Sequence, residues 1–238
     1  MGNAAASPPA PDHHLPKRSK QRDWIEIGIA YALIEVVEWT PRPWQRGLWL
    51  VAALGIAFIF WRSFDGWAAM GFRTANLWRS AWIVAAVAAL SAAAMLISAR
   101  AHALLMVEGI WVFPETYGAY AVWSCVQQIL LQGFFLLRLL RVTPRPWQAA
   151  LLAATLFSAA HIPNPILVSL TFIWGFVACL LFLRYRNIYP LMLAHAFLGI
   201  TIAMTIPGPV VHNMRVGRAY LNYRPHMHAS HTYYLSQP

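Results

Sequence analysis

The sequence predicts an all-α protein, a polytopic membrane bundle of about seven transmembrane helices. Of its 238 residues, 59% are hydrophobic and only 11% are charged, less than half the charged share of ordinary soluble domains. The apolar residues gather in runs, and many of the 12 tryptophans lie near the ends of these runs, as in an interfacial aromatic belt. A soluble domain is excluded because the chain has too little polar surface to cover itself.

Seven apolar runs are the predicted helices, because crossing the hydrocarbon takes about 20 residues. The first run is interrupted by Glu26, Glu35 and Glu38, and carboxylates at mid-membrane are costly unless they face a partner or water. The alternative for this run is a helix that lies in the membrane interface. The runs are residues 24–39, 47–61, 80–98, 117–137, 147–162, 166–183 and 188–207.

This interpretation divides the chain into three parts. Residues 1–22 are predicted to be a disordered basic N-terminal tail, residues 23–210 the transmembrane helical domain, and residues 211–238 a polar, His/Tyr-rich C-terminal tail. In this last tail, arginines beside aromatic residues suit a surface that faces lipid headgroups or a partner. These arginines are Arg215, Arg218 and Arg224.

The distribution of Lys and Arg predicts the orientation. If all seven runs cross, twelve of these residues fall on the side of the N-terminus and six on the other side. The twelve lie in the N-terminal tail and in the loops around 62–79, 138–146 and 184–187, so Arg138 is counted as a loop residue. The positive-inside rule then predicts a cytoplasmic N-terminus and an external C-terminus, in what we expect to be a bacterial inner membrane. If residues 24–39 lie flat, the counts become eight and ten, and the bias disappears. The net charge of +10 is spread between apolar runs, which suits lipid phosphates and not a nucleic acid.

Polar side chains inside three of the apolar runs are the candidate functional residues, because intramembrane polar groups usually face a cavity or a partner. Gln128 and Gln132 are four residues apart and therefore share one helix face. A single such group would be read as a hydrogen bond between helices, but several in three helices favour a shared cavity. The candidates are Gln127, Gln128, Gln132, His161 and His195, with Phe157 and Gly199 beside them.

The segments around these residues resemble one family of membrane enzymes. QQILLQGFFLLRLLR, FSAAHIPNP and RNIYPLMLAHAFLG are similar, in this order, to the motif helices of the CAAX-protease and bacteriocin-processing (CPBP) intramembrane proteases. GFRTANLW resembles the segment that precedes those helices in the family. The resemblance covers about residues 66–200 and implies the CPBP fold, with the three motif helices around one cavity.

The resemblance also implies where this chain departs from the family. The family motifs are Glu-Glu-x-x-x-Arg, Phe-x-x-x-His and His-x-x-x-Asn, and their glutamate is held to activate water for attack on a peptide carbonyl. The departures are Gln127 and Gln128 for the two glutamates, Gln132 for the arginine and Gly199 for the asparagine. A glutamine amide can orient water but cannot take its proton, so the implied site is neutral.

Two hypotheses about function follow. The first is a non-catalytic binding or accessory subunit of a membrane complex, which holds a transmembrane helix or another hydrophobic partner in the former substrate cavity. The alternative is a divergent intramembrane protease in which His161 or His195 acts as base on a water held by Gln127 and Gln128. No cofactor and no metal are predicted, since two neutral histidines form a weak metal site, and axial ligation of a haem is a third interpretation. The binding-subunit hypothesis and the protease hypothesis differ in whether a carboxylate reaches the histidines. The candidates for that role are Glu26, Glu35, Glu108 and Glu115.

Overall fold

The computed structural model describes residues 18–105 and 112–224, which form helices joined by short connections, with no strand in these two ranges. All seven predicted runs are helical, and the predicted all-α fold class is confirmed. The first half of the chain contains α1 (Lys20–Trp39), α2 (Trp44–Arg62), α3 (Leu77–Ser80) and α4 (Trp82–Arg100). The second half contains α5 (Val112–Gln128), the π-helix η1 (Ile129–Leu136), α6 (Leu137–Val142), α7 (Pro146–Ala159), α8 (Pro165–Tyr185) and α9 (Tyr189–Thr205). The chain then continues through α10 (Gly208–Val211), the 3₁₀-helix η2 (His212–Met214) and α11 (Gly217–Leu221).

Within the described residues, four helices are long and apolar enough to span a membrane, and α9 is a shorter apolar helix. The four are Trp44–Arg62, Leu77–Arg100, Val112–Val142 and Pro165–Tyr185. Apolar side chains remain exposed on the outside of the bundle, including Leu54 and Ile97, which are 62% and 69% exposed. The chain is therefore an integral membrane protein. The count of seven crossings stays a prediction, because α1 carries several charges and α7 is short.

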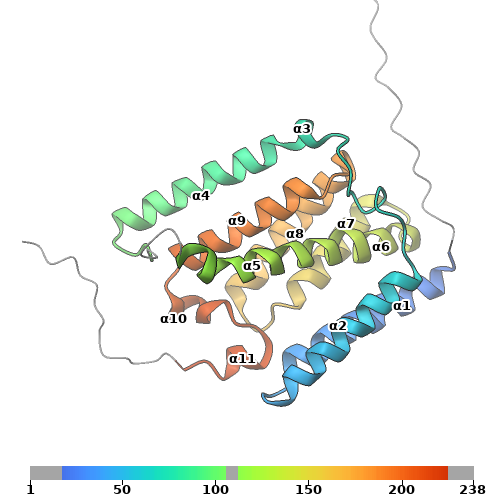
Figure 1. The fold of residues 1–238 in the computed structure, drawn as a ribbon, viewed down its shortest axis with the longest axis horizontal. Helices are drawn as coiled ribbons and strands as arrows, with labels where there is room; N and C mark the ends of the chain where they lie inside the picture. The colour runs from blue at the N-terminus through green and yellow to red at the C-terminus, as the bar shows by residue number, and fades with distance from the viewer. Residues whose placement is uncertain (1–17, 106–111, 225–238) are drawn as a thin grey trace, which may run out of the picture.

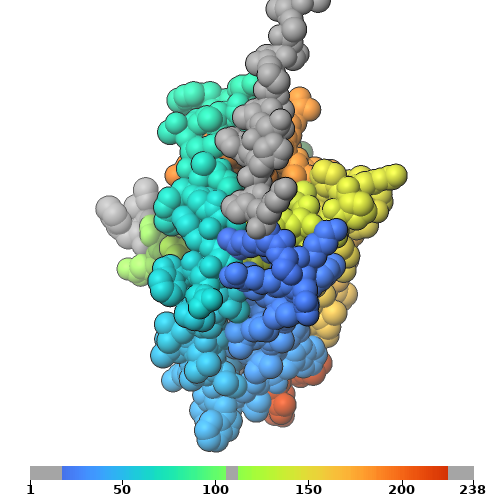
Figure 2. Space-filling view, turned by 90° about the vertical axis from the view of Figure 1, so that its right-hand side faces the viewer, coloured from blue at the N-terminus to red at the C-terminus, as the bar shows by residue number. Residues whose placement is uncertain are grey.

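The helices form a bundle in which α5, η1 and α6 make one continuous central helix (Figure 1). Helix α9 packs between α4 and α5, and α7 packs against α8 and η1. Helices α1 and α2 form an antiparallel pair that contacts the rest of the bundle through α6 and α11. Figure 2 shows this pair side by side on the outer face.

The start of α1 and the three loops predicted to share its side of the membrane meet at one end of the bundle. Arg141 at the end of α6 forms ion pairs with Asp23 of α1, at 3.1 Å, and with Asp65 in the α2–α3 connection. The same connection reaches the α8–α9 turn, where Arg73 Nε donates to the carbonyl of Arg186 at 2.8 Å. At the other end, the Leu105 amide donates to the carbonyl of Met204 in α9, and the Gly217 amide at the start of α11 donates to the carbonyl of Ile162. When successive helices run from one end of a bundle to the other, alternate connections lie at the same end. Which end faces the cytoplasm stays a prediction.

The GFRTANLW segment holds the α2–α3 connection against the α8–α9 turn. Gly71 has a φ of +86°, and a Cβ there would lie 2.7 Å from the Phe182 ring and 3.0 Å from the backbone nitrogen of Ile188. Glycine therefore serves two purposes, the left-handed backbone and the close approach. Asn76 Nδ2 then donates to the carbonyl of Tyr185 at 3.1 Å, which fixes the start of α3.

One charge assignment from the sequence is corrected by the structure. Arg138, counted above among loop residues, lies inside α6 and is only 1% exposed. Its Nε donates to Glu26 of α1 at 2.9 Å, it also donates to Ser63 Oγ, and its Cζ lies 3.6 Å from the centre of the Phe134 ring. One of the three glutamates that made α1 an uncertain span is thus paired inside the bundle, which reduces the cost of placing it there.

The predicted tail boundaries also differ from the structure. Helix α1 begins at Lys20, inside the predicted N-terminal tail, because Asp23 is buried against Arg141. Part of the predicted C-terminal tail is helical, since α11 packs against α1 and the Gly217 amide donates to the carbonyl of Ile162 at 2.8 Å. The rest of both tails, residues 1–17 and 225–238, lies outside the described residues.

Candidate functional site

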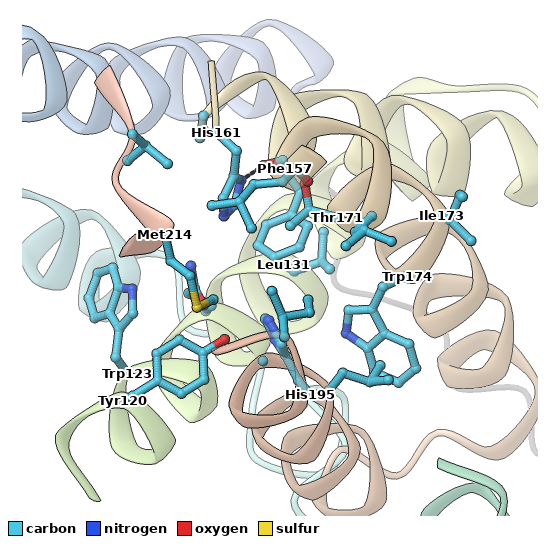
Figure 3. A pocket seen from close by; sticks show the side chains of 18 of the residues that line it. Tyr120, Trp123, Leu131, Phe157, His161, Thr171, Ile173, Trp174, His195 and Met214 are labelled. Carbon is cyan, nitrogen blue, oxygen red and sulfur yellow. Dashed lines mark hydrogen bonds between the residues drawn. The ribbon is translucent and has the colours of Figure 1, made fainter. Parts of the chain in front are cut away.

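A central cavity of about 900 Å³ opens among α1, α4, α5, α7, α8 and α9 (Figure 3). Its wall is mostly apolar and aromatic, with Trp123, Leu131 and Trp174 among the side chains that face it. A few polar groups interrupt this wall. An apolar cavity with a small number of convergent polar groups is the usual form of a binding site.

The structure brings the sequence candidates together at this cavity. Gln127 from α5, His161 from the α7–α8 connection and His195 from α9 line the wall. Gln128 and Gln132 are fully buried directly behind it. Phe157 and Gly199, which completed the motifs, also line the cavity. The expected convergence is therefore present, with two of the three glutamines as supports and not as wall residues.

A chain of amide hydrogen bonds fixes the orientation of His195. Gln132 Nε2 donates to Gln128 Oε1 at 3.5 Å, and Gln128 Nε2 lies 2.9 Å from His195 Nδ1. Since the amide nitrogen is a donor, Nδ1 accepts and the remaining proton of a neutral imidazole is on Nε2. His195 therefore offers a donor as its second ring nitrogen.

His161 is held in the opposite tautomer. Its Nδ1 lies 2.7 Å from the carbonyl of Phe157, one turn earlier in α7, and a carbonyl can only accept. In the neutral ring Nε2 is then an acceptor. The Phe157 ring lies edge-on to both imidazoles, with centroid distances of 5.1 Å to His161 and 5.7 Å to His195. The cavity thus contains one imidazole acceptor and one imidazole donor on two sides of a single aromatic ring.

The π-helix coincides with the glutamine motif. It spans Ile129–Leu136, so it begins directly after Gln128 and contains Gln132. Such segments are rare and are often found at functional sites. At Gly133 an ideal Cβ would lie 3.0 Å from Met70 Cε, so the helix and the α2–α3 connection approach closely here.

Tyr120 is a cavity residue that the sequence analysis missed. A Cβ at Gly199 would overlap the Tyr120 hydroxyl, and it would lie only 2.5 Å from ring atom Cε1. The phenol of α5 thus takes up the space that a side chain at position 199 of α9 would need, and Figure 3 shows its hydroxyl pointing toward His195. A signal for it was present in the spacing, since Tyr120, Ser124 and Gln127 follow one another at i, i+4 and i+7 on one helix face.

The carboxylate at the cavity is one that the sequence analysis did not name as a candidate. Glu38, near the end of α1, lines the wall. Glu26 is turned toward Arg138, Glu115 is exposed on α5 and does not line the cavity, and Glu35 accepts from Trp39 Nε1 at 3.1 Å. Glu108 lies outside the described residues. The Nδ1 atoms of His161 and His195 bond the Phe157 carbonyl and the Gln128 amide, so neither has a carboxylate as its partner.

Metal ligation has no centre in the described part of the chain, where no group of three His, Cys, Asp or Glu side chains converges. His212 of the C-terminal segment instead stacks on Tyr220 and Tyr223, with centroid distances of 4.0 Å and 4.7 Å. The remaining histidines of the tail, His226, His228 and His231, lie outside the described residues.

Fold and site together define a polytopic helical membrane protein with a motif-lined cavity inside its bundle. Residues 109–201, about two fifths of the chain, match the family described as type II CAAX prenyl endopeptidase Rce1-like. This segment is thus similar to that family, and the resemblance to the CPBP family deduced from the motifs is confirmed. No curated protein and no solved structure gives a significant match to the chain.

Proposed function

We propose that this protein is a non-catalytic member of the CPBP family that binds a transmembrane helix or a comparable hydrophobic segment in its central cavity, as an accessory subunit of a membrane complex. The observation that carries this proposal is that both imidazole rings form their hydrogen bonds with neutral groups. Gln128 and the Phe157 carbonyl occupy one nitrogen of each ring, and the Gln127 amide and the Tyr120 phenol line the same cavity. Such groups can bind and orient, but no strong base stands beside a nucleophile.

The size of the cavity agrees with a helical occupant. A helix about 10 Å across occupies roughly 400 Å³ per turn, so a cavity of 900 Å³ corresponds to about two turns. The apolar wall would contact side chains of such a segment. Tyr120, Gln127 and the two imidazoles would then bond backbone or polar groups that the membrane leaves unsatisfied.

Retention of a partner tests this proposal. We expect the protein, purified in mild detergent, to carry a specific membrane protein or segment that mass spectrometry identifies. Ala94→Trp, which fills the cavity from α4, should abolish retention, whereas Ala93→Trp on the exposed side of the same helix should not. Equal retention by both tryptophan variants would show that the partner binds elsewhere and would contradict the proposal.

Peptidase assays test the absence of catalysis. A positioned base contributes about 10²–10⁴-fold to hydrolysis, and we expect no turnover above background. Gln127→Glu with Gln128→Glu should not create activity, because Gln132 provides no positive charge and the new carboxyl groups would stay protonated in an apolar site. His161→Ala and His195→Ala should leave this background level unchanged, because neither imidazole acts as a base in the proposed function.

The second candidate, a divergent intramembrane protease, is favoured by one observation, the presence of Glu38 at the cavity wall. In that mechanism His161, whose Nε2 is an acceptor, would take a proton from water, and Glu38 would stabilise the imidazolium. Cleavage of a transmembrane substrate by the wild-type protein, lost in His161→Ala and Glu38→Gln, would establish this candidate and eliminate the first.

A further inference from the structure

A second pocket lies apart from the central cavity, at the end of the bundle where the α1–α2 turn meets α11. Its volume is about 260 Å³. Two segments that are far apart in the sequence form it, and we call it the arginine pocket. Its polar lining is Thr40, Arg42, Gln45, Arg215, Arg218 and Asn222.

The arginine pocket carries positive charge without a carboxylate in its lining. Arg42, Arg215 and Arg218 all line it, and none of the three takes part in an ion pair within residues 18–105 and 112–224. The opposite end of the bundle differs, since Arg138 and Arg141 each have a carboxylate partner there. Three guanidinium groups around one small pocket repel one another unless an anion lies between them.

Nearby contacts hold parts of this pocket in place. The Arg215 side chain is half-buried, with its Cζ 5.4 Å from the centre of the Tyr223 ring. Gln45 Nε2 donates to the carbonyl of Val37 at 3.1 Å, and the Thr40 hydroxyl donates to the carbonyl of Val36, so the α1–α2 turn is tied to α1. Asn222 adds a side-chain amide to the rim. The pocket is thus organised before any ligand binds.

We propose that the arginine pocket binds a phosphate group, supplied by the headgroup of an anionic membrane lipid. Planar guanidinium groups with several donors match the oxygens of phosphate, and phosphate is the anionic group that lipid headgroups present at a membrane surface. The exposed rings of Trp39 and Trp44 flank the turn that supplies Arg42, and tryptophans mark the depth of lipid headgroups. A soluble phosphate has the same chemistry, and competition with inorganic phosphate distinguishes the two sources.

Binding at this pocket would also hold the segment that covers the central cavity. Arg215 lies between Met214 and Val216, both of which line the cavity. Asn164 Nδ2 donates to the carbonyl of Val211 at 2.9 Å and to that of Arg215 at 3.1 Å, so the segment is anchored beside the His161 connection. A phosphate bound to the Arg215 side chain would add a third anchor. The phosphate site itself does not depend on what the cavity binds.

Lipid retention by the full-length protein tests the proposal. The variant is Arg215→Gln with Arg218→Gln, and the control is Arg46→Gln with Arg100→Gln, which removes the same charge near the same end without touching the pocket. Native mass spectrometry would measure retained phosphatidylglycerol at several lipid concentrations. We expect the pocket variant to bind about 30-fold more weakly, from roughly fivefold for each arginine, and the control to bind as the wild type does.

Competition with inorganic phosphate and the retention by the pocket variant decide between the other outcomes. If inorganic phosphate at millimolar concentration displaces the lipid and binds by itself, the anion site is supported and its source is soluble. If the pocket variant retains phosphatidylglycerol as well as the wild type and the control do, the proposal is wrong. Thermal unfolding checks that the variants fold, and Arg218→Gln alone, at an exposed side chain, gives a second measurement with expected weakening of about fivefold.

Discussion

Replacing Gly199 with alanine would place a methyl group where the Tyr120 phenol now lies. Cε1 of that ring, 2.5 Å from the ideal Cβ, would have to retreat to at least 3.4 Å, and the hydroxyl, which overlaps the Cβ, would have to move farther. The ring lines the central cavity and can yield into that space. We expect overpacking to cost about 1–3 kcal/mol, while alanine in a helix recovers about 0.5–1 kcal/mol relative to glycine. The net expected loss of stability is about 0–2.5 kcal/mol.

Gly118→Ala provides the matched control for this substitution. Gly118 lies on α5, two residues before Tyr120, and a Cβ there would meet nothing within 4 Å. This variant should gain the helical preference of alanine without a clash, so it should be more stable than the wild type by about 0.5–1 kcal/mol. The free energy of unfolding, measured by titration with a denaturing detergent in mixed micelles, would compare the two alanines directly.

The double variant Tyr120→Ala with Gly199→Ala identifies the cause. If the phenol is what the new methyl meets, then removing the ring should make alanine at position 199 harmless. The coupling energy of the cycle should be favourable by about 1–3 kcal/mol. Additivity of the two substitutions within about 0.5 kcal/mol would refute the reasoning, because residues in this contact cannot be independent.

The remaining predictions concern the buried charges and the orientation. Glu26→Gln leaves the Arg138 guanidinium buried beside a neutral amide, which should lower the free energy of unfolding by about 3–5 kcal/mol, whereas the exposed Glu115→Gln should change it by less than about 0.5 kcal/mol. Equal effects would mean that Arg138 is hydrated in the membrane. Cysteines introduced at Ser19 and Ser236 should react with an impermeant thiol reagent from opposite sides, and labelling from one side would instead place α1 in the interface.

The sequence predicted the helices well because each is an apolar run of nearly the length that a membrane requires. The predicted run 188–207 corresponds to Tyr189–Thr205, and 166–183 to Pro165–Tyr185. The candidate site was predicted equally directly for His161 and His195, since a polar residue inside such a run must face the interior. Helix ends and interior polar residues are local properties, which a single sequence expresses.

Contacts between distant segments were not predictable in the same way. Arg138 was taken for a loop residue because an arginine near the end of an apolar run usually reaches for water, and its partner Glu26 lies 112 residues away. Tyr120 was missed because a tyrosine in a membrane helix is read as an interface anchor until the empty space at Gly199 is known. Glu38 was seen only as an interruption of its helix, since nothing local shows which way it faces.

The π-helix sets the angular phase between two sets of contacts on one continuous helix. Before it, Gln128 is directed at His195, and after it, Arg138 is directed at Glu26 on a different neighbour. Because successive residues of an α-helix are turned by about 100°, deleting one residue from Ile129–Leu136 would rotate one set away from its partners even if every side chain remained. Substitutions at the glutamines can therefore change the chemistry of the cavity while Arg138 stays directed at Glu26. Insertions and deletions within these eight residues cannot leave both sets of contacts in place. The length of this segment should therefore tolerate less change than its composition.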